Sequence, residues 1–104
     1  MFQIKITKIL LNPMTKTEQV FEADDIFETD SIILNFLKSE ETEKESYQDL
    51  IRKYNLAVRR FNRDKSDQII IYTHPLPGTV VRCIIEIYQK IGKEINKLLW
   101  FKKN

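Results

Sequence analysis

Cysteine, glycine and proline are all scarce in this sequence of 104 residues, which contains one, two and three of them respectively. Because Cys83 is the only cysteine, no internal disulfide can form, which favours a reducing compartment or indifference to redox conditions. No stretch approaches the roughly 20 apolar residues that a bilayer crossing needs. The first five residues alternate in polarity and do not resemble the apolar segment of a signal peptide. We therefore expect an intracellular, cytoplasmic protein that does not associate with membranes.

The residues that are present are typical of one folded domain. Hydrophobic residues make up 42% of the chain and charged residues 31%, which is the balance of a globular protein rather than a disordered one. We expect residues 1–104 to form a single domain with a modest core and little room for a deep substrate cleft. Abundant Ile, Lys, Glu and Asn suit an AT-rich genome, a thermophile, or a viral or mobile-element gene. A viral protein of this kind would act in the host cytoplasm.

Charge is distributed unevenly along the chain, although the net charge is only +2. Residues 1–51 contain five lysines and eleven acidic residues, whereas residues 52–104 contain twelve basic and four acidic residues. The basic half is a candidate for binding an anion. It is equally a candidate for pairing with the acidic half, either within the fold or between two copies of the chain.

The N-terminal third is expected to form a β-hairpin. Residues 2–6 alternate in polarity with the period of a half-buried strand, and a later change of phase predicts a bulge near Thr7 and Lys8. Asn12-Pro13 predicts the turn, and residues 17–23 form the second strand. Residues 24–38 fit either a helix or a strand. We favour a strand over residues 31–37, preceded by an acidic turn.

Two further elements have clearer patterns. Thr42 and Glu45 fit a capping box, and the residues that follow have the 3.6-residue period of an amphipathic helix that ends near 62–65. Residues 68–74 contain an unbroken run of β-branched residues, which is typical of a central strand buried on both faces.

The last third predicts a long helix. Residues 75–78, Pro-Leu-Pro-Gly, end the preceding strand, and Thr79 is a suitable N-cap. The expected helix runs from Thr79 to Lys102 because its apolar residues follow a regular three–four spacing: Val81, Ile84, Tyr88, Ile91, Ile95 and Leu98.

Together these elements predict an α+β fold with the order β-β-(β or α)-α-β-α. We expect a small antiparallel or mixed sheet of three to four strands, with two long amphipathic helices packed on one face.

Three sets of residues resemble fragments of catalytic or ligand sites. The turn before Thr79 would place a helix N-terminus, with its free amides, where an anion can bind. His74 and Cys83 have the residue types of a base and a thiol nucleophile. Acidic residues in the first half are candidates for acid–base or Mg²⁺ chemistry, or for a solvated surface. None has a specific motif, so we expect no enzyme, and we assign no catalytic residue, cofactor or metal. The acidic set comprises Asp24, Asp25, Glu28, Asp30, Glu40, Glu41, Glu43 and Glu45.

The basic residues give the strongest functional signal. They recur at helical spacing opposite the apolar stripes, so they predict cationic faces that follow phosphates without reading sequence; the alternative is an ordinary solvated surface. We therefore expect a non-enzymatic protein associated with nucleic acid. The candidate residues are Arg52, Arg59, Arg60 and Arg63, together with Lys90, Lys93 and Lys97.

A second hypothesis is a protein-interaction module, for example a small inhibitor or adaptor. Its surface would be the apolar end of the C-terminal helix, which is wide enough to predict exposure and therefore a partner. A homodimer formed through this helix is the expected assembly. The candidate interface residues are Ile95, Leu98, Leu99, Trp100 and Phe101.

Overall fold

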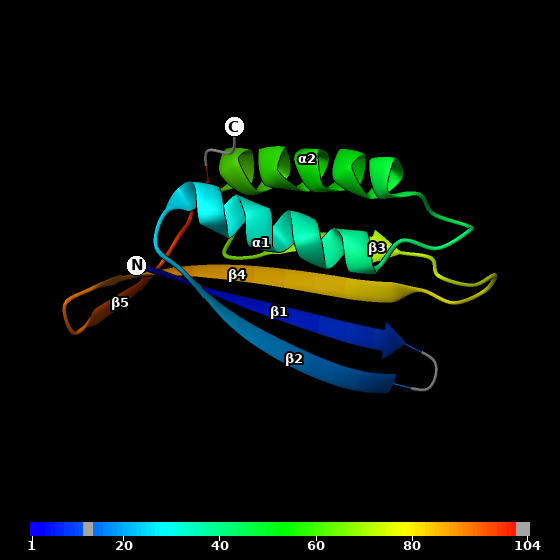
Figure 1. Ribbon diagram of the computed structural model, residues 1–104, viewed down its shortest axis with the longest axis horizontal. Helices are drawn as coiled ribbons and strands as arrows, with labels where there is room; N and C mark the ends of the chain where they lie inside the picture. The colour runs from blue at the N-terminus through cyan, green and yellow to red at the C-terminus, as the bar shows by residue number, and fades with distance from the viewer. Residues whose placement is uncertain (12–13, 102–104) are drawn as a thin grey trace.

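The protein has an α+β fold in which one antiparallel sheet carries two helices on a single face (Figure 1). The computed structural model describes residues 1–11 and 14–101. The predicted class is confirmed, but the described chain has five strands, and its order is β-β-α-α-β-β-β. The elements are β1 (Phe2–Leu11), β2 (Met14–Ala23), α1 (Ile26–Ser39), α2 (Tyr47–Asp64), β3 (Ile69–Thr73), β4 (Val81–Ile91) and β5 (Glu94–Lys97).

The strand order across the sheet is β2-β1-β4-β3, and β5 pairs with β4 beyond the end of β3. The central strands are therefore β1 and β4, and β3 lies at an edge of the sheet. The prediction that residues 68–74 form a central strand is wrong. Ile69 and Ile71 are buried, whereas Tyr72 is exposed, so only one side of β3 faces the core. An apolar run in sequence does not distinguish a central strand from an edge strand whose other face is partly covered.

The N-terminal hairpin is confirmed, with one correction. The pairing of β1 with β2 and with β4 is continuous in register, so the predicted bulge near Thr7 and Lys8 is absent. The change of phase has a simpler cause. Ile4 and Ile6 face the helices, and the odd-numbered Ile9 lies on the opposite face of the same regular strand. The predicted turn residues, Asn12 and Pro13, lie outside the described part of the chain.

Residues 26–39 form a helix, so the preference for a strand over residues 31–37 is wrong. Asp25 is the N-cap, and its side chain accepts a hydrogen bond of 2.8 Å from the Glu28 amide. The Glu28 carboxylate in turn accepts one of 3.0 Å from the Asp24 amide. This reciprocal capping satisfies donors at the helix start, and the sequence analysis interpreted the same acidic residues as a turn. The helix buries Ile33 and Leu37 against the sheet.

The second helix is confirmed, but it begins after Ser46 and not at Thr42. The Ser46 hydroxyl accepts a hydrogen bond of 3.2 Å from the Asp49 amide. Thr42 and Glu45 do interact, because the Thr42 hydroxyl accepts a bond of 3.1 Å from the Glu45 amide, but they lie in the loop before the helix. The helix ends at Asp64, and Lys65 follows in the left-handed region with φ 49°.

The predicted helix from Thr79 to Lys102 is wrong. Residues 81–91 and 94–97 are strands joined by a tight turn, and Lys102 lies outside the described residues. Gly78 and Gly92 have φ values of +78° and +60°, a region that glycine adopts without steric cost, and each lies in a hairpin connection. The misleading pattern arises because Val81, Cys83 and Ile85 face the helices while Ile84, on the other face of the strand, is also buried, so the apolar residues of β4 do not alternate strictly.

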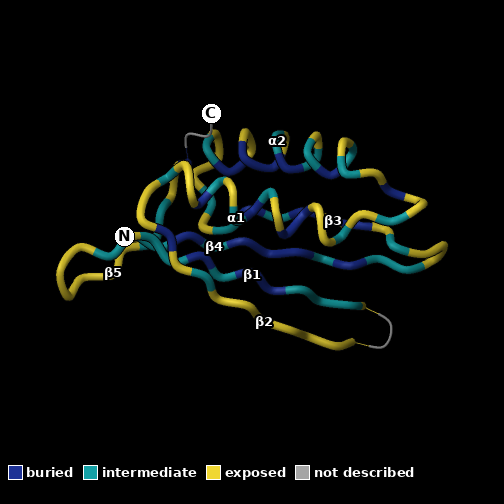
Figure 2. The backbone as a smooth tube through the Cα atoms, viewed as in Figure 1, coloured by how far each residue is buried: buried dark blue, intermediate teal, exposed yellow. Residues whose placement is uncertain are grey.

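The core lies between the sheet and the helices and is closed by the end of the described chain. Phe101 is 1% exposed, and its backbone forms two hydrogen bonds with the Asn62 side chain, of 2.7 and 2.8 Å. Figure 2 shows that buried residues are concentrated in β1, β4 and the inner sides of the helices, whereas β2 is mostly exposed. In the described residues, no helix has both the length and the apolarity of a membrane span.

Candidate nucleic-acid interface

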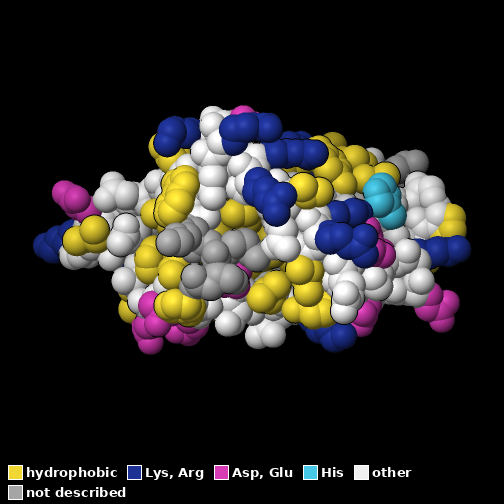
Figure 3. Space-filling model, turned by 90° about the horizontal axis from the view of Figure 1, so that it is seen from above, with side chains coloured by type: hydrophobic (Ala, Val, Ile, Leu, Met, Phe, Trp, Pro, Cys, Tyr) yellow, Lys and Arg dark blue, Asp and Glu magenta, His cyan; other side chains and the backbone are white. Residues whose placement is uncertain are grey.

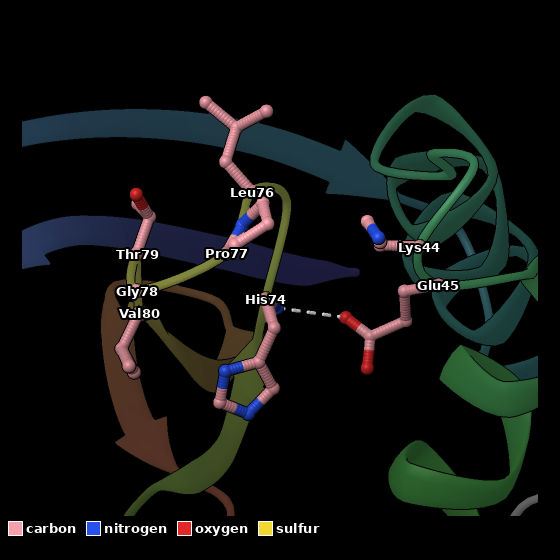
Figure 4. Close-up of a pocket in the computed structure, with 8 residues that line it drawn as sticks. All are labelled: Lys44, Glu45, His74, Leu76, Pro77, Gly78, Thr79 and Val80. Carbon is pink, nitrogen blue, oxygen red and sulfur yellow. Dashed lines mark hydrogen bonds between the residues drawn. The ribbon is translucent and has the colours of Figure 1, made fainter.

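The turn that was expected to begin a helix is a hairpin connection between β3 and β4, so it supplies no helix N-terminus for an anion. It borders a shallow hollow of about 450 Å³ that also contacts Lys44 and Glu45 (Figure 4). The His74 amide donates a hydrogen bond of 2.9 Å to the Glu45 carboxylate, and the His74 ring extends away from that carboxylate. The polar groups at this hollow therefore hold the turn against the loop before α2.

His74 and Cys83 do not form a base–nucleophile pair. His74 is exposed just after β3, whereas Cys83 is 0% exposed near the start of β4, opposite Ile71. Burial raises the pKa of the Cys83 thiol to about 11, and the negative charge of Glu40 adds to that effect. A thiol with such a pKa is protonated near neutral pH and is a poor nucleophile.

The acidic set is dispersed, and several members have structural partners. Asp25 and Glu28 cap α1. Glu40 pairs with Lys8 at 2.6 Å, and the Asp30 carboxylate accepts a hydrogen bond of 2.6 Å from the Tyr54 hydroxyl. In the described chain, no three His, Cys, Asp or Glu side chains form a group suited to a metal ion.

Glu45 is the most buried member of the acidic set, at 7% exposed, and nothing in the sequence indicated its partners. Its carboxylate forms an ion pair with Lys53 of α2. Lys53 also donates a hydrogen bond of 2.7 Å to the carbonyl oxygen of Tyr72 in β3. One lysine therefore connects the interhelical loop, α2 and the edge strand. It is occupied by these partners and is not available as a free cation.

The basic residues of α2 form the candidate interface. The helix buries Leu50, Ala57 and Phe61. Arg52, Arg59 and Arg63 lie on the opposite side, and Arg60 lies on the flank of the helix that borders β3. Arg59 and Arg60 are exposed and, within the described residues, have no acidic partner at ion-pair distance. Figure 3, viewed from the helix side, shows dark-blue Lys and Arg side chains gathered on this face. We call Arg52, Arg59, Arg60 and Arg63 the α2 basic face.

Two members of the α2 basic face have partners that leave them accessible. Arg52 pairs with Asp49 at 2.8 Å, and Arg63 pairs with the adjacent Asp64 at 2.8 Å. The side chains of these arginines remain 75% and 72% exposed. Such surface pairs are weak, so both guanidinium groups remain accessible to a phosphate.

The other predicted basic residues lie elsewhere. Lys90 and Lys97 belong to β4 and β5, and Lys93 lies in the turn between these strands. Lys97 is 2.5 Å from Glu86 and 3.7 Å from Asp67, and Lys90 is 3.2 Å from Glu22. The two predicted basic faces therefore do not form one surface, and the second is largely neutralised by acidic partners within the fold.

A groove borders the α2 basic face along the edge of β3. Its walls include Leu56 and Arg60 from the helix and Ile70 and Tyr72 from the strand. Tyr72 is 46% exposed. Tyr72 and Arg60 line the same groove, and an exposed aromatic residue offers a stacking surface for a nucleic-acid base. The sequence analysis missed this aromatic residue because it lies within an apolar strand.

The predicted C-terminal interface divides into two parts. Phe101 is a core residue, and Leu98 is half-buried, with its amide donating a bond of 2.8 Å to the Ile87 carbonyl. Ile95, Leu99 and Trp100 are 58%, 49% and 53% exposed. These residues do not form one helical stripe, because none of them belongs to a helix.

Comparison of the chain with protein-family models, curated proteins and solved structures finds no match.

Proposed function

We propose that the protein is a non-enzymatic nucleic-acid-associated protein that binds the phosphate backbone through the α2 basic face. The observation that carries the proposal is the contrast between exposed Arg59 and Arg60, which have no ion-pair partner in the described residues, and the neutralised lysines of β4 and β5. Arginine presents several donors in a planar fork that matches phosphate oxygens. The face is therefore suited to following a phosphate backbone.

The adjoining groove favours a single strand over a duplex. Arg60 and Tyr72 line the same groove, so a strand with its phosphates on the helix passes an exposed aromatic residue that offers a stacking surface to an unpaired base. Stacking on an aromatic ring tolerates any base, because every base has a π-face. Binding should therefore be weak, tolerant of sequence and strongly dependent on salt.

The test compares variants that remove the same amount of charge from two places. Arg59→Ala with Arg60→Ala removes two cations that form no ion pair within the described residues from the α2 basic face. Lys44→Ala with Lys93→Ala removes two exposed cations from other parts of the molecule. Fluorescence anisotropy with labelled single-stranded and duplex oligonucleotides, measured over a series of salt concentrations, gives the affinity and its salt slope.

We expect the arginine variant to lose affinity for all sequences and to flatten the salt slope by about 0.7 for each lost phosphate contact on a single strand. The lysine variant should behave like the wild type. No binding by the folded wild-type protein even at the lowest salt concentration would refute the proposal, and equal losses in both variants would remove the α2 basic face as the site.

The interaction-module hypothesis loses its predicted surface, because the C-terminal helix does not exist. Exposed Leu99 and Trp100 are what remains of that surface. The homodimer is still a prediction, but its interface cannot be that helix.

A further inference from the structure

The edge of the sheet along β2 is unpaired in this fold. Within residues 1–11 and 14–101, β2 pairs only with β1, and every residue from 14 to 20 is exposed (Figure 2). Proteins usually protect such an edge with proline, a bulge, a covering segment or charged side chains, because free backbone groups attract another strand. Residues 14–23 contain no proline or glycine, and their register with β1 is continuous, so their protection consists of the charged residues Lys16, Glu18 and Glu22. This edge is therefore able to accept a strand whose charges are complementary to its own.

The side chains of β2 divide cleanly between the two faces of the sheet. Phe21 and Ala23 pack against the core on the helix side, so the even-numbered residues lie on the opposite, open face. That face carries an apolar residue near each end of the exposed stretch and two opposite charges between them. In order along the strand, these residues are Met14, Lys16, Glu18 and Val20.

This pattern is complementary to itself. If two copies of β2 pair antiparallel about a two-fold axis at Thr17, each Lys16 lies opposite Glu18 of the second copy. Each Met14, which is 75% exposed, then lies opposite Val20 of the second copy, which is 56% exposed. Directly opposed residues of opposite charge, and directly opposed apolar residues, stabilise a pair of antiparallel strands.

Neighbouring registers fit less well. An axis at Lys16 or at Glu18 places two like charges directly opposite each other, which is destabilising. An axis at Gln19 places the charged Glu18 opposite the apolar Val20. Two-fold registers centred on a residue keep the open faces of both copies on the same side of the joined sheet. Of the four compared, only the register centred on Thr17 places opposite charges opposite each other and apolar residues opposite each other.

We propose that the protein forms a two-fold homodimer by pairing its β2 edges about Thr17, which joins the two sheets into one. The axis is perpendicular to the sheet, so the helices of both copies lie on the same face. A contact made mainly by one strand from each copy is small, and interfaces below about 1,200 Å² usually belong to weak complexes. The dimer should therefore depend on protein concentration.

Charge reversal tests both the dimer and its register. Lys16→Glu leaves glutamates at positions 16 and 18, and Glu18→Lys leaves lysines at both, so each variant opposes like charges in its own dimer. We expect each to weaken self-association about tenfold or more, since two cross-strand pairs change from attraction to repulsion. Sedimentation equilibrium over a concentration series measures the effect, and circular dichroism verifies that each variant is folded.

Mixing provides the decisive measurement. The two single variants should form a one-to-one heterodimer with each other, because every pair then opposes glutamate and lysine. The variant carrying both Lys16→Glu and Glu18→Lys should recover the homodimer. Neither result is expected from the register centred on Gln19, which would place residue 16 opposite Glu22 of the second copy.

The control variant Lys93→Glu makes the same change in net charge as Lys16→Glu, but in the exposed turn after β4. It should leave self-association unchanged. A wild-type protein that stays monomeric up to its solubility limit would overturn the proposal. So would a dimer that is unaffected by both single reversals, or single variants that do not associate when they are mixed.

Discussion

One row of paired residues crosses the sheet and shows how differently its two edges are built. Ile71 in β3 lies opposite Cys83, Cys83 lies opposite Lys8, and Lys8 lies opposite Thr17 in β2. Ile71 is 2% exposed and Cys83 is 0% exposed, whereas Thr17 is exposed. Both β2 and β3 are edge strands, yet only β3 is buried at this level of the sheet.

The helical layer causes the difference. α2 packs over β3, and Lys53 donates a hydrogen bond to the Tyr72 carbonyl oxygen at that edge. α1 packs against the part of β2 that contains Phe21 and Ala23, which leaves residues 14–20 exposed. The comparison shows that the helices above a strand, and not its position in the sheet, decide whether an edge belongs to the core or is available to a partner.

The largest expected effect is on stability at the β3 edge. Ile71→Ala should lower the free energy of unfolding by about 2–5 kcal/mol, because it removes buried methyl groups and leaves a cavity. The matched truncation on the other edge, Val20→Ala, should change it by less than about 0.5 kcal/mol, because Val20 is 56% exposed. Urea denaturation at a low protein concentration measures both values. Similar losses in the two variants would contradict the comparison.

A smaller effect is expected from the charged groups at the two edges. Glu45→Gln should lower the free energy of unfolding by about 1.5–3 kcal/mol, because a buried carboxylate that binds Lys53 and the His74 amide loses its charge. Glu18→Gln on β2 should have no measurable effect on the stability of the monomer, since the Glu18 carboxylate is 3.2 Å from Lys16 and 3.7 Å from Lys5 in exposed ion pairs, and such pairs contribute little. Thermal unfolding followed by circular dichroism distinguishes the two outcomes. A Glu45→Gln variant as stable as the wild type would show that this ion pair does not hold the β3 edge.

The smallest effect at neutral pH concerns Cys83. Cys83→Ala should cost about 1 kcal/mol, a typical core perturbation. Native Cys83 should react with a thiol reagent at pH 7 only as fast as the protein unfolds, because the thiol is buried and its pKa is raised to about 11. Rapid modification of the folded protein would mean that reagent and solvent reach Cys83 in β4, next to the β3 edge.

Alkaline pH extends the same test. The folded protein holds the Cys83 proton more tightly than the unfolded chain, whose thiol has a pKa of 9.0. The stabilising contribution of this thiol is therefore complete below about pH 9, and it is lost at about 1.4 kcal/mol per pH unit as the pH rises towards 11. Burial also raises the pKa of Tyr54, which acts in the same direction. Cys83→Ala should reduce the alkaline loss, as measured by urea denaturation at pH 8, 9 and 10; an unchanged pH dependence would contradict this assignment.

Sequence patterns identified the elements whose apolar residues lie on one face. The strand β1 and the helix α2 were predicted from a clear period of two or 3.6. The strand β3 was predicted from an unbroken apolar run, which placed it wrongly at the centre of the sheet. α1 was ambiguous because both periods fit it, and its capping pair, Asp25 and Glu28, was the signal that favoured a helix. β4 was misread because Val81, Cys83 and Ile85 face the helices while Ile84 lies on the other face and is also buried, so its apolar residues coincide with helical spacing.

The candidate site was only partly accessible from the sequence. Helical spacing correctly placed Arg52, Arg59 and Arg63 on the outer side of α2. It did not reveal that Lys97 pairs with Glu86 or that Lys53 pairs with Glu45, because these contacts depend on how the strands and the interhelical loop assemble. The groove beside Tyr72 arises from the packing of α2 over β3, which no local pattern encodes.

The pairing of β1 with β4 has a consequence for how the chain folds as it is synthesised. Phe2 pairs with Gln89, so β1 leaves the ribosome long before β4, its second neighbour in the sheet, has been synthesised. Contacts between such distant residues slow folding, because a long loop must close before they stabilise the structure. We therefore expect the protein to fold more slowly than a helical protein of the same length. Until β4 pairs with β1, both edges of the N-terminal hairpin are exposed and can pair with strands of other unfolded chains.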